Sequence, residues 1–458
     1  MTSTREQRAV WLRTIADRLD EQTDELVGIA DRETHLGAAR LTGEVARTTG
    51  QLRLFADVAL EGSYLEAVLD EARPDATPPQ PEIRRVLRPV GPVAVFSASN
   101  FPFAFSVAGG DTASALAAGC PVIVKAHSGH IELSRRTAEI VTQALDEAGA
   151  PAGTFALVEG REAGIDLVTA PNTRAVSFTG SLAGGRALLD AIATRPEPIP
   201  FYGELGSINP VVVTPAALAA RGEELGSGLV ASFTLGGGQF CTKPGVVFVP
   251  RGFASATSIA ERVNALARPT LLTDRIADAF GETLERLLSV EGVDLVAGGA
   301  VRDGAPAPTV LQASIAAFTE HSDALLEECF GPLTLLIEYG SLDEVEWAID
   351  AVAGSLTATV HAEPADDIRG LVDRLAALAG RVLFDGWPTG VAVTWGQHHG
   401  GPWPATNTQH TSVGATAIRR FLRPIAYQNA PAEALPFDLT DAGLARIPHR
   451  RNGELILP

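Results

Sequence analysis

From Pro92 onward, the chain alternates short apolar segments with stretches of helical length. The apolar segments have strand character and fall at residues 93–99, 121–125, 155–160 and 175–180. Between the second and third, residues 130–148 place Leu133, Ile140 and Leu145 on one face of a helix. Strands that alternate with helices of this length pair in parallel and are covered on both faces. The pattern therefore predicts an α/β fold with a doubly wound parallel sheet.

Other segments flank this sheet. Helical spacing over residues 8–70 predicts a bundle of helices, and the prolines from Pro74 to Pro81 end it. Residues 82–90 have strand character and predict one side of a projecting hairpin, while residues 421–428 form another candidate strand. A second α/β region runs from about Val211 to residue 400.

Composition limits the class of protein. The 458 residues suffice for two or three domains with a large core. With 36 Lys and Arg against 55 Asp and Glu, the net charge of −19 argues against nucleic acid or an anionic membrane as partner. We expect no signal peptide and no transmembrane helix. The 3 cysteines have no CxxC spacing, which argues against a disulfide framework or a zinc site and favours the cytoplasm.

A glycine-rich stretch ends in a cysteine. Gly236 to Gly238 lead through Gln239 and Phe240 to Cys241. Because glycines permit sharp turns and close approach to a ligand, such a loop can display a reactive thiol. The alternative is an ordinary loop with a half-buried cysteine, and the loop by itself favours neither interpretation.

A carboxylate lies 37 residues before this cysteine, since 241 − 204 = 37. Glu204 stands between Gly203 and the Leu-Gly of an apolar run, a setting that suits a movable general base. Together the Glu-Leu-Gly and Gly-Gln-x-Cys segments resemble the aldehyde dehydrogenase superfamily. The resemblance implies that Cys241 is the nucleophile and that Glu204 activates water. It also implies hydrolytic rather than acyl-transferring chemistry, because acylating relatives commonly lack this carboxylate.

Asn100 follows the first strand of the sheet, in Ser-Asn-Phe-Pro-Phe. Doubly wound sheets bind ligands at this edge, although Asn also serves commonly as a turn or cap residue. The segment resembles the family's Trp-Asn-Phe-Pro, with Ser99 in place of the tryptophan. The resemblance makes the Asn100 amide a stabiliser of the oxyanion and places Phe101 at the substrate.

Further segments resemble the family's cofactor site. Lys125 ends a strand, and Ser128 stands where NAD-preferring members often carry a glutamate, so Lys125, His127 and Ser128 can all donate to a 2′-phosphate. We therefore expect NADP, with NAD also possible. Phe-Thr-Gly-Ser opens a helix suited to a pyrophosphate and assigns Gly180, Ser181 and Gly185. The Glu-Glu-Cys-Phe-Gly-Pro segment assigns Glu328 to the nicotinamide ribose and Phe330 to the ring.

The resemblance also implies a division of the chain. Residues 1–73 and 91–206 would form a Rossmann-type cofactor-binding domain, and residues 207–415 an α/β catalytic domain. Residues 74–90 and 416–435 would form a small oligomerisation element of a homodimer or homotetramer.

The substrate is the least defined part of the resemblance. The segment His398-His-Gly-Gly-Pro-Trp-Pro-Ala-Thr resembles a branch containing α-ketoglutaric semialdehyde (2,5-dioxopentanoate) dehydrogenases and NADP-dependent fatty aldehyde dehydrogenases. We expect oxidation of the semialdehyde to 2-oxoglutarate, with a fatty aldehyde dehydrogenase or a non-catalytic binding protein on the same fold as alternatives. Arg53 is the candidate for holding a distal acid, or else pairs with Asp57. His399 either lines the substrate pocket or is structural, and no metal site is expected.

Overall fold

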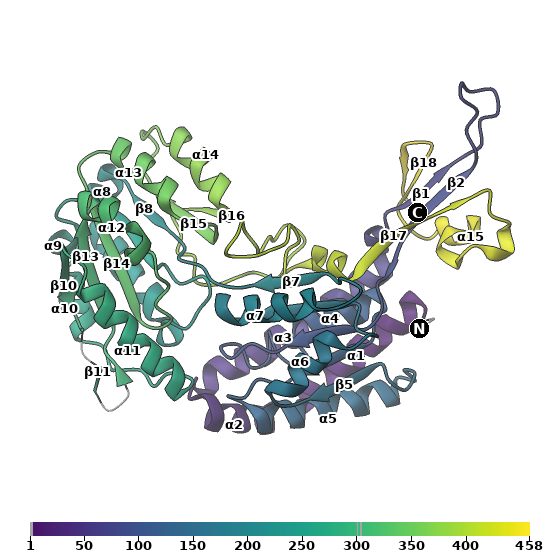
Figure 1. Ribbon diagram of the computed structural model, residues 1–458, viewed down its shortest axis with the longest axis horizontal. Helices are drawn as coiled ribbons and strands as arrows, with labels where there is room; N and C mark the ends of the chain where they lie inside the picture. The colour runs from purple at the N-terminus through teal and green to yellow at the C-terminus, as the bar shows by residue number, and fades with distance from the viewer. Residues whose placement is uncertain (1–2, 300, 303–304) are drawn as a thin grey trace.

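The computed structural model describes residues 3–299, 301–302 and 305–458. A first α/β unit is built on a five-stranded sheet in which all strands pair in parallel (Figure 1). Its order is β5-β4-β3-β6-β7, formed by β3 (Val93–Phe96), β4 (Val122–Lys125), β5 (Phe155–Val158), β6 (Ala175–Thr179) and β7 (Phe201–Glu204).

Both faces of this sheet are covered. Val93 and Val95 of β3 enter one apolar core, while Ala94 and Phe96 enter another, because successive side chains of a strand point to opposite faces. The first core is completed by α4 (Gly110–Ala118) and α5 (Ile131–Glu147), and the second by α6 (Arg161–Thr169) and α7 (Leu182–Ala193). The predicted doubly wound sheet is therefore confirmed.

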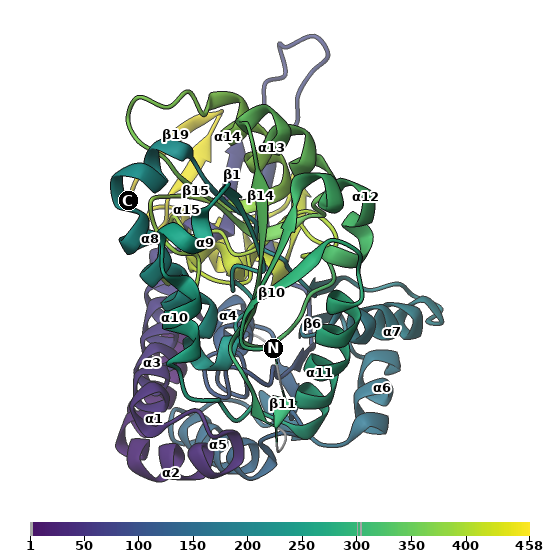
Figure 2. The ribbon, with the colours of Figure 1, turned by 90° about the vertical axis from the view of Figure 1, so that its left-hand side faces the viewer.

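Three N-terminal helices extend the first core: α1 (Arg5–Glu21), α2 (Thr23–Thr34) and α3 (Ala38–Glu61). Their apolar residues, among them Leu12, Leu26 and Leu52, share one core with α4 and α5. Figure 2 shows α1 and α3 running side by side along one edge of the molecule. The predicted bundle of helices thus exists, but it ends at Glu61, and residues 67–70 form a strand instead.

The second α/β unit contains a seven-stranded sheet of order β10-β13-β14-β9-β8-β15-β16, in which only the edge strand β10 runs antiparallel. The strands are β8 (Val211–Val213), β9 (Val246–Pro250), β10 (Val293–Ala297), β13 (Thr309–Ser314), β14 (Leu333–Tyr339), β15 (Ser355–His361) and β16 (Ala379–Phe384). Its helices are α8 (Pro215–Thr234), α9 (Phe253–Ala256), α10 (Ile259–Asn264), α11 (Asp274–Leu288), α12 (Ile315–Leu325), α13 (Leu342–Ala348) and α14 (Arg369–Leu378). A separate pair joins β11 (Val301–Arg302) to β12 (Ala305–Pro306).

A third sheet projects from the body as an arm (Figure 1). Its order is β17-β2-β1-β18-β19, from β1 (Ala67–Asp70), β2 (Ile83–Pro89), β17 (Leu422–Gln428), β18 (His449–Arg451) and β19 (Glu454–Ile456), with α15 (Asp441–Leu444) beside it. The predicted limits of the oligomerisation element, 74–90 and 416–435, take in β2 and β17 and leave out the other three strands of this sheet, and that division stays a prediction. Two of the strands left out, β1 and β18, pair in parallel although they come from nearly opposite ends of the chain.

A buried ion pair ties the base of the arm to the first unit. Arg420 lies just before β17, and its Nη2 donates to Oδ1 of Asp111 in α4 over 2.6 Å. Both side chains are buried, so removing either partner would leave an uncompensated charge inside the protein.

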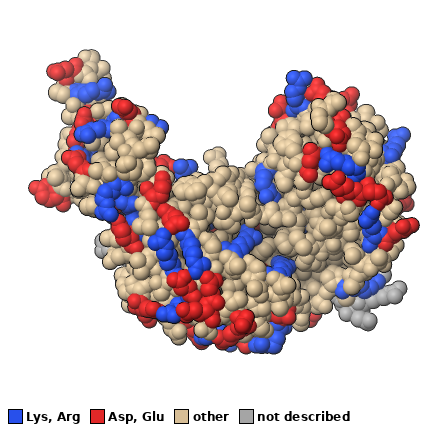
Figure 3. Space-filling model, turned by 180° about the vertical axis from the view of Figure 1, so that it is seen from behind, with Lys and Arg blue, Asp and Glu red and all other residues tan. Residues whose placement is uncertain are grey.

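Charges are not spread evenly over the surface. In Figure 3, acidic and basic side chains intermingle over the body below the arm, while the hollow between the arm and the second unit is mostly uncharged. In the part of the chain that the structure describes, we find no helix with the length and apolar character needed to cross a membrane.

Candidate active site

The nucleophile candidate stands on a tight glycine turn between the two units. Helix α8 ends at Thr234, and a 3-10 turn (Leu235–Gly238) follows it directly. Gly238 has φ +70°, and a Cβ there would lie 2.2 Å from the carbonyl oxygen of Gly331. Because no side chain fits at that distance and that backbone angle, the position requires glycine. The predicted role of the glycines in displaying Cys241 therefore has a steric cause.

Asn209 holds the cysteine segment from behind. Its Nδ2 donates to the carbonyl oxygens of Cys241 at 2.7 Å and of Lys243 at 2.9 Å, and the side chain is fully buried. Sequence reasoning missed this residue. The only signal available was an Asn before Pro210 at the end of the Glu-Leu-Gly segment, and that pattern usually indicates a turn.

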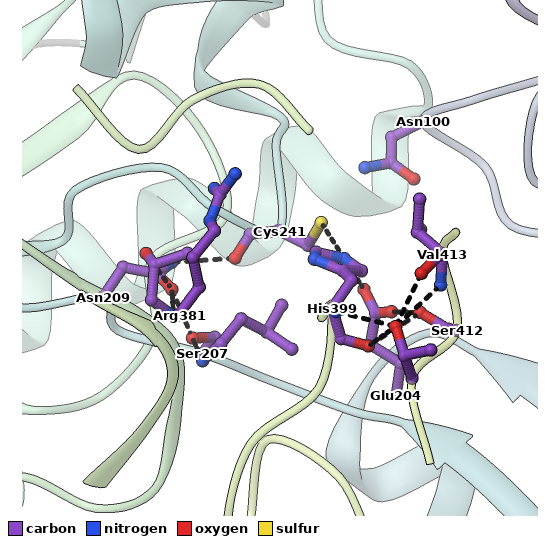
Figure 4. Close-up of polar contacts among 12 residues, drawn as sticks. Asn100, Glu204, Ser207, Asn209, Cys241, Arg381, His399, Ser412 and Val413 are labelled. Atoms are coloured by element: carbon purple, nitrogen blue, oxygen red, sulfur yellow. Dashed lines mark hydrogen bonds and ion pairs between the residues drawn. The ribbon is translucent and has the colours of Figure 1, made fainter. Parts of the chain in front are cut away.

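Three functional groups meet at Cys241 (Figure 4). His399 lies between the other two, with Nε2 3.6 Å from Cys241 Sγ and 3.1 Å from Glu204 Oε1. The second oxygen of Glu204, Oε2, accepts a hydrogen bond from Ser412 Oγ at 2.8 Å. Glu204 ends strand β7, whereas His399 and Ser412 come from the segment between β16 and β17, so the site forms only when these regions pack together.

The surroundings of the site favour the protonated form of Cys241 and the ionised form of Glu204. Burial and the neighbouring Glu204 carboxylate raise the pKa of the Cys241 thiol well above its usual range, and Arg47 opposes them. Burial also raises the pKa of Glu204, but His399 and the Ser412 hydroxyl outweigh it and hold that pKa below its usual value. The resting site therefore contains a protonated thiol beside an ionised carboxylate, so the thiol needs a proton acceptor before it can attack.

The same three side chains offer Nε2, Sγ and a carboxylate oxygen within 4.8 Å of one another, a spacing open to a metal ion. In the structure these atoms contact each other directly, as a nucleophile and its acid–base partners do. We interpret the group in that second way, and the absence of a metal requirement stays a prediction.

Asn100 lies across the site from Glu204 (Figure 4). Its Nδ2 donates to the carbonyl oxygen of Gln239 at 3.0 Å, and the backbone carbonyl oxygen of Asn100 accepts a hydrogen bond from Arg40 Nη2 at 2.6 Å. These contacts hold the buried amide next to the cysteine segment. The arrangement fits the predicted oxyanion role, since an amide N–H and a backbone N–H can converge on one oxygen.

The residues predicted to hold a pyrophosphate lie at the start of α7. Ser181 caps the helix by accepting a hydrogen bond from the Gly184 N–H at 3.2 Å, which leaves other N–H groups of the first turn facing outward. At Gly185 a Cβ would lie 2.2 Å from Leu205 Cδ2, so glycine there lets α7 pack against the β7 end. Gly180 precedes this turn and donates to the Glu204 carbonyl at 3.0 Å. The cradle fits a dinucleotide.

The predicted ribose and 2′-phosphate residues lie together after β4. Lys125 ends the strand half-buried, and burial lowers the pKa of its ammonium. Burial, with the charges of His130 and Lys125, lowers the pKa of His127 to about 3, so this imidazole is neutral. Its Nδ1 accepts from the Gly129 N–H at 3.0 Å, which leaves Nε2–H as a donor. Ser128 is exposed beside them.

Glu328 and its neighbour Glu327 have different surroundings. Glu327 is exposed and pairs with Arg286, as expected for a surface acid. Burial raises the pKa of Glu328 to about 7, opposed by Lys243. A Cβ on Gly206 would lie 2.9 Å from Glu328 Oε2, which locates this carboxylate beside the Glu-Leu-Gly segment. Phe330 follows, half-buried, before the Gly331 that fits against the cysteine turn.

Of the predicted substrate residues, two lie at the cysteine and one does not. Phe101 packs against Phe240, which precedes Cys241, with ring centroids 5.1 Å apart. His399 contacts the cysteine, so it is more than a pocket wall. The prediction for Arg53 needs correction, because its Nη2 is bound to Asp17 at 2.6 Å and Asp20 at 2.8 Å on the outer side of α3.

The other two cysteines are core residues, as expected. Burial raises the pKa of Cys120 to about 11 and that of Cys329 to about 12, so neither forms a thiolate near neutral pH. Cys241 is the half-buried one of the 3 free cysteines.

Sequence and structure comparisons bear on the identity of this site. The model of the aldehyde dehydrogenase family matches residues 1–403. The chain is 46% identical to alpha-ketoglutaric semialdehyde dehydrogenase 2 of Azospirillum brasilense, over 98% of this chain and 87% of that protein. It is 41% identical to alpha-ketoglutaric semialdehyde dehydrogenase of Acinetobacter baylyi, over 99% of this chain and 88% of that protein.

A solved structure of 3,6-anhydro-L-galactose dehydrogenase in complex with NAP has a TM-score of 0.79 and 23% identity, and the match covers 93% of this chain and 88% of that one. At that identity the likeness concerns the fold. The family match spans both α/β units and the site residues described above except Ser412, which lies beyond its end at residue 403. The displayed cysteine, its buried carboxylate and the helix-start cradle are thus the expected parts of one reaction centre, and the chain belongs to the aldehyde dehydrogenase family as an NAD(P)-dependent aldehyde dehydrogenase.

Proposed function

We propose that this enzyme oxidises α-ketoglutaric semialdehyde to 2-oxoglutarate, with NADP as the preferred cofactor. The observation that carries the chemistry is the contact chain from Cys241 Sγ through His399 Nε2 to Glu204 Oε1, with distances of 3.6 and 3.1 Å. The choice of substrate is supported by the 46% and 41% identity to two proteins named for that activity.

The first step is attack of the thiol on the aldehyde. In the tautomer that carries the imidazole proton on Nδ1, His399 Nε2 has a free lone pair, so it can take the proton from Cys241 Sγ and then donate it in a hydrogen bond to Glu204 Oε1. The sulfur forms a bond to the aldehyde carbon, and the carbonyl π electrons move to oxygen. Asn100 Nδ2 and the Cys241 N–H stabilise the resulting oxyanion.

The second step oxidises the thiohemiacetal to a thioester. A nicotinamide cofactor held here would supply the redox chemistry, as the acceptor of a hydride from the former aldehyde carbon. We assign Gly180, Ser181 and Gly185 to hold the pyrophosphate, and Glu328 to accept hydrogen bonds from the nicotinamide ribose. Phe330 closes the ring side of the site. The protein's own contribution is to hold the thiohemiacetal and exclude water.

The third step releases the acid. Glu204 takes a proton from a water molecule, whose oxygen adds to the thioester carbon, and the Cys241 thiolate leaves. The two hydrogen-bond partners of Glu204 keep the carboxylate ionised and ready to act as a base. The net reaction converts aldehyde, water and oxidised cofactor into carboxylic acid, reduced cofactor and a proton.

The preference for NADP rests on Lys125, His127 and Ser128. A 2′-phosphate placed here would meet one cation and two neutral donors, with none of these three side chains an acid. An NAD-preferring site would instead offer a carboxylate to the ribose 2′-hydroxyl.

The arm is the proposed self-association element of a homodimer or homotetramer. Strands β2 and β17 pair over seven residues at the free edge of its sheet, and an exposed edge strand is a template for another strand. We place the enzyme in the cytoplasm, because its cysteines are free thiols.

A substrate panel tests the proposed function. Production of the reduced cofactor by the full-length enzyme should give the highest kcat/KM with α-ketoglutaric semialdehyde, compared with succinic semialdehyde, hexanal and decanal. Cys241→Ala should abolish turnover and retain NADP binding, because the thiol bonds to the substrate and not to the cofactor. A kcat/KM for decanal above that for the semialdehyde would refute the substrate, and turnover by Cys241→Ala would refute the mechanism.

A further inference from the structure

Two arginines of helix α3 lie against the active site with unused hydrogen-bond donors. In Arg47, both Nε and Nη2 are buried and have no hydrogen-bond partner among the described residues. In Arg40, Nη1 is in the same condition, while Nη2 is bound to the Asn100 carbonyl. The two residues are seven positions apart, which places them on one face of the helix, two turns from each other.

Aromatic rings connect both guanidinium groups to the reacting centre. Arg40 lies 4.9 Å from the ring centroid of Phe240, the residue before Cys241. Arg47 lies 5.4 Å from the ring of Phe101 and 5.5 Å from that of Phe105. Since Phe101 follows Asn100 and packs against Phe240, the rings and the two cations lie beside the segments that carry Asn100 and Cys241.

Electrostatic effects point the same way. Burial lowers the pKa of Arg47, while the charges of Glu44, Cys241 and Glu204 oppose that change, so its guanidinium lies close enough to the catalytic groups for their charges to act on it. The Arg47 charge in turn lowers the pKa of Cys241 against the larger effects of burial and Glu204. Buried N–H groups without partners destabilise a protein unless a ligand completes them.

Glu44 is the acid on helix α3 that could pair with Arg40 and Arg47. Glu44 lies between the two arginines in sequence, and its Oε1 accepts from the N–H groups of Phe103 and Ala104 at 2.8 and 3.0 Å. Its Oε2 has no hydrogen-bond partner among the described residues, and burial raises its pKa. Glu44 is thus the acid beside both arginines on helix α3, and its hydrogen bonds go to backbone N–H groups and not to either guanidinium.

A third arginine near the cysteine, Arg381, uses more of its hydrogen-bond donors. The Cys241 charge also acts on Arg381 of β16, but Nη1 and Nη2 of Arg381 donate to the carbonyls of Gly390 and Pro388 at 2.9 and 2.8 Å. Only its Nε remains without a partner. Arg47 differs because its two free donors, Nε and Nη2, form the side-on edge of the guanidinium, the edge that fits the two oxygens of a carboxylate.

We infer that Arg47 binds the distal carboxylate of the substrate through Nε and Nη2, and that Arg40 adds a third donor through Nη1. The enzyme would thereby select short aldehydes that carry an acid group at the far end. The inference rests on the proposed function. In an extended α-ketoglutaric semialdehyde, the acid carbon lies roughly 5 Å from the aldehyde carbon, as expected for four carbon–carbon bonds. The phenylalanine rings would pack against the intervening methylenes.

The test compares Arg47→Gln with Arg53→Gln, a matched control on the same helix whose guanidinium is exposed and bound to Asp17 and Asp20. For each variant, kcat/KM is measured with α-ketoglutaric semialdehyde and with pentanal, which has the same chain length and no acid. Arg47→Gln should lower the ratio of the two values roughly tenfold to hundredfold, as expected for loss of a charge-assisted bidentate contact. Arg53→Gln should leave the ratio unchanged.

A second measurement avoids turnover. Iodoacetate and iodoacetamide alkylate the same thiol and differ in a carboxylate. Relative to a free thiol, the wild-type enzyme should favour iodoacetate at Cys241, and Arg47→Gln should lose that preference. Arg47→Lys retains the charge near the thiol and loses the two-donor edge, so it should preserve the iodoacetamide rate while weakening selection for the acid. Thermal unfolding and NADP binding are measured for every variant to establish that it is folded.

Failure of the inference is distinguishable from failure of the proposed function. Parallel loss on both aldehydes, with an unchanged iodoacetate preference, would mean that Arg47 only supports the thiol and the phenylalanine rings. If Arg40→Gln/Arg47→Gln still selected the acid-bearing aldehyde, the carboxylate would bind elsewhere. A wild-type preference for succinic semialdehyde would overturn the proposed substrate, while the effect of Arg47→Gln on the acid-to-neutral ratio would still test the inference.

Discussion

Replacing His399 with glutamine tests whether His399 accepts the proton of the Cys241 thiol. Burial and the charge of Glu204 raise the pKa of the Cys241 thiol well above its usual range. An unperturbed thiol, with a pKa of about 8.5, is ionised in roughly 10% of molecules at pH 7.5, and Cys241 is ionised in fewer. Attack at neutral pH therefore depends on the acceptor at Nε2, 3.6 Å from the sulfur. A glutamine of similar size can still contact Glu204 and cannot take up a proton.

The expected loss follows from the value of a positioned base. General-base catalysis contributes typically about 10²–10⁴-fold, or roughly 3–5 kcal/mol of activation free energy. We expect the burst of reduced cofactor in a single turnover, and the alkylation of Cys241 by iodoacetamide, to slow by about 10²-fold or more at pH 7.5. Because the thiol pKa is raised, thiolate is scarce at neutral pH, and the alkylation rate of the variant should climb with pH into the alkaline range.

His398→Gln is the matched control, since that half-buried imidazole neighbours His399 in sequence and, within the described residues, makes no hydrogen bond to Cys241 or Glu204. It should alkylate at the wild-type rate. If His399→Gln were alkylated within threefold of wild type at pH 7.5, His399 would not be the acceptor, and Glu204 would have to take the thiol proton directly.

Four further predictions concern the base, the cofactor and the arm. Glu204→Gln should keep the single-turnover burst while steady-state turnover falls by roughly 10²–10⁴, because water activation follows hydride transfer; loss of both would assign Glu204 an earlier role. Ser128→Glu should weaken NADP binding and spare NAD, as measured by fluorescence titration, and equal NADP affinity would place the 2′-phosphate elsewhere. Cofactor affinity should increase as the pH rises through about 7, the pKa of Glu328, because the ionised carboxylate is the better acceptor for ribose hydroxyls; a flat profile, or the same rise in Glu328→Gln, would contradict this. Light scattering at micromolar concentration should find an oligomer, and Ile425→Pro in the edge strand β17 should weaken it. A wild-type monomer would refute self-association by the arm.

The sequence by itself determined the parts whose signals are local. The alternation of strands and helices specified the doubly wound sheet, because burying both faces requires apolar runs at that spacing. The three glycines before Cys241 indicated a turn whose backbone angles favour glycine. Ser181 indicated the start of a helix, because serine is a common N-cap residue. Resemblance over these short segments predicted roles for Cys241, Glu204 and Asn100, and the structure brings these three side chains together.

Only the tertiary structure decided which distant side chains meet. Arg40, Arg47 and Arg53 belong to one helix, and nothing in their sequence surroundings distinguishes the arginines that face the thiol from the one that pairs with surface acids. The outcome depends on which face of α3 packs against Phe101 and Phe105. The same reason explains His399, whose contact with Cys241 and Glu204 requires the segment after β16 to fold back between the two α/β units. It also explains the pairing of β1 with β18, since strands so far apart in the chain carry no local pattern that names their partner.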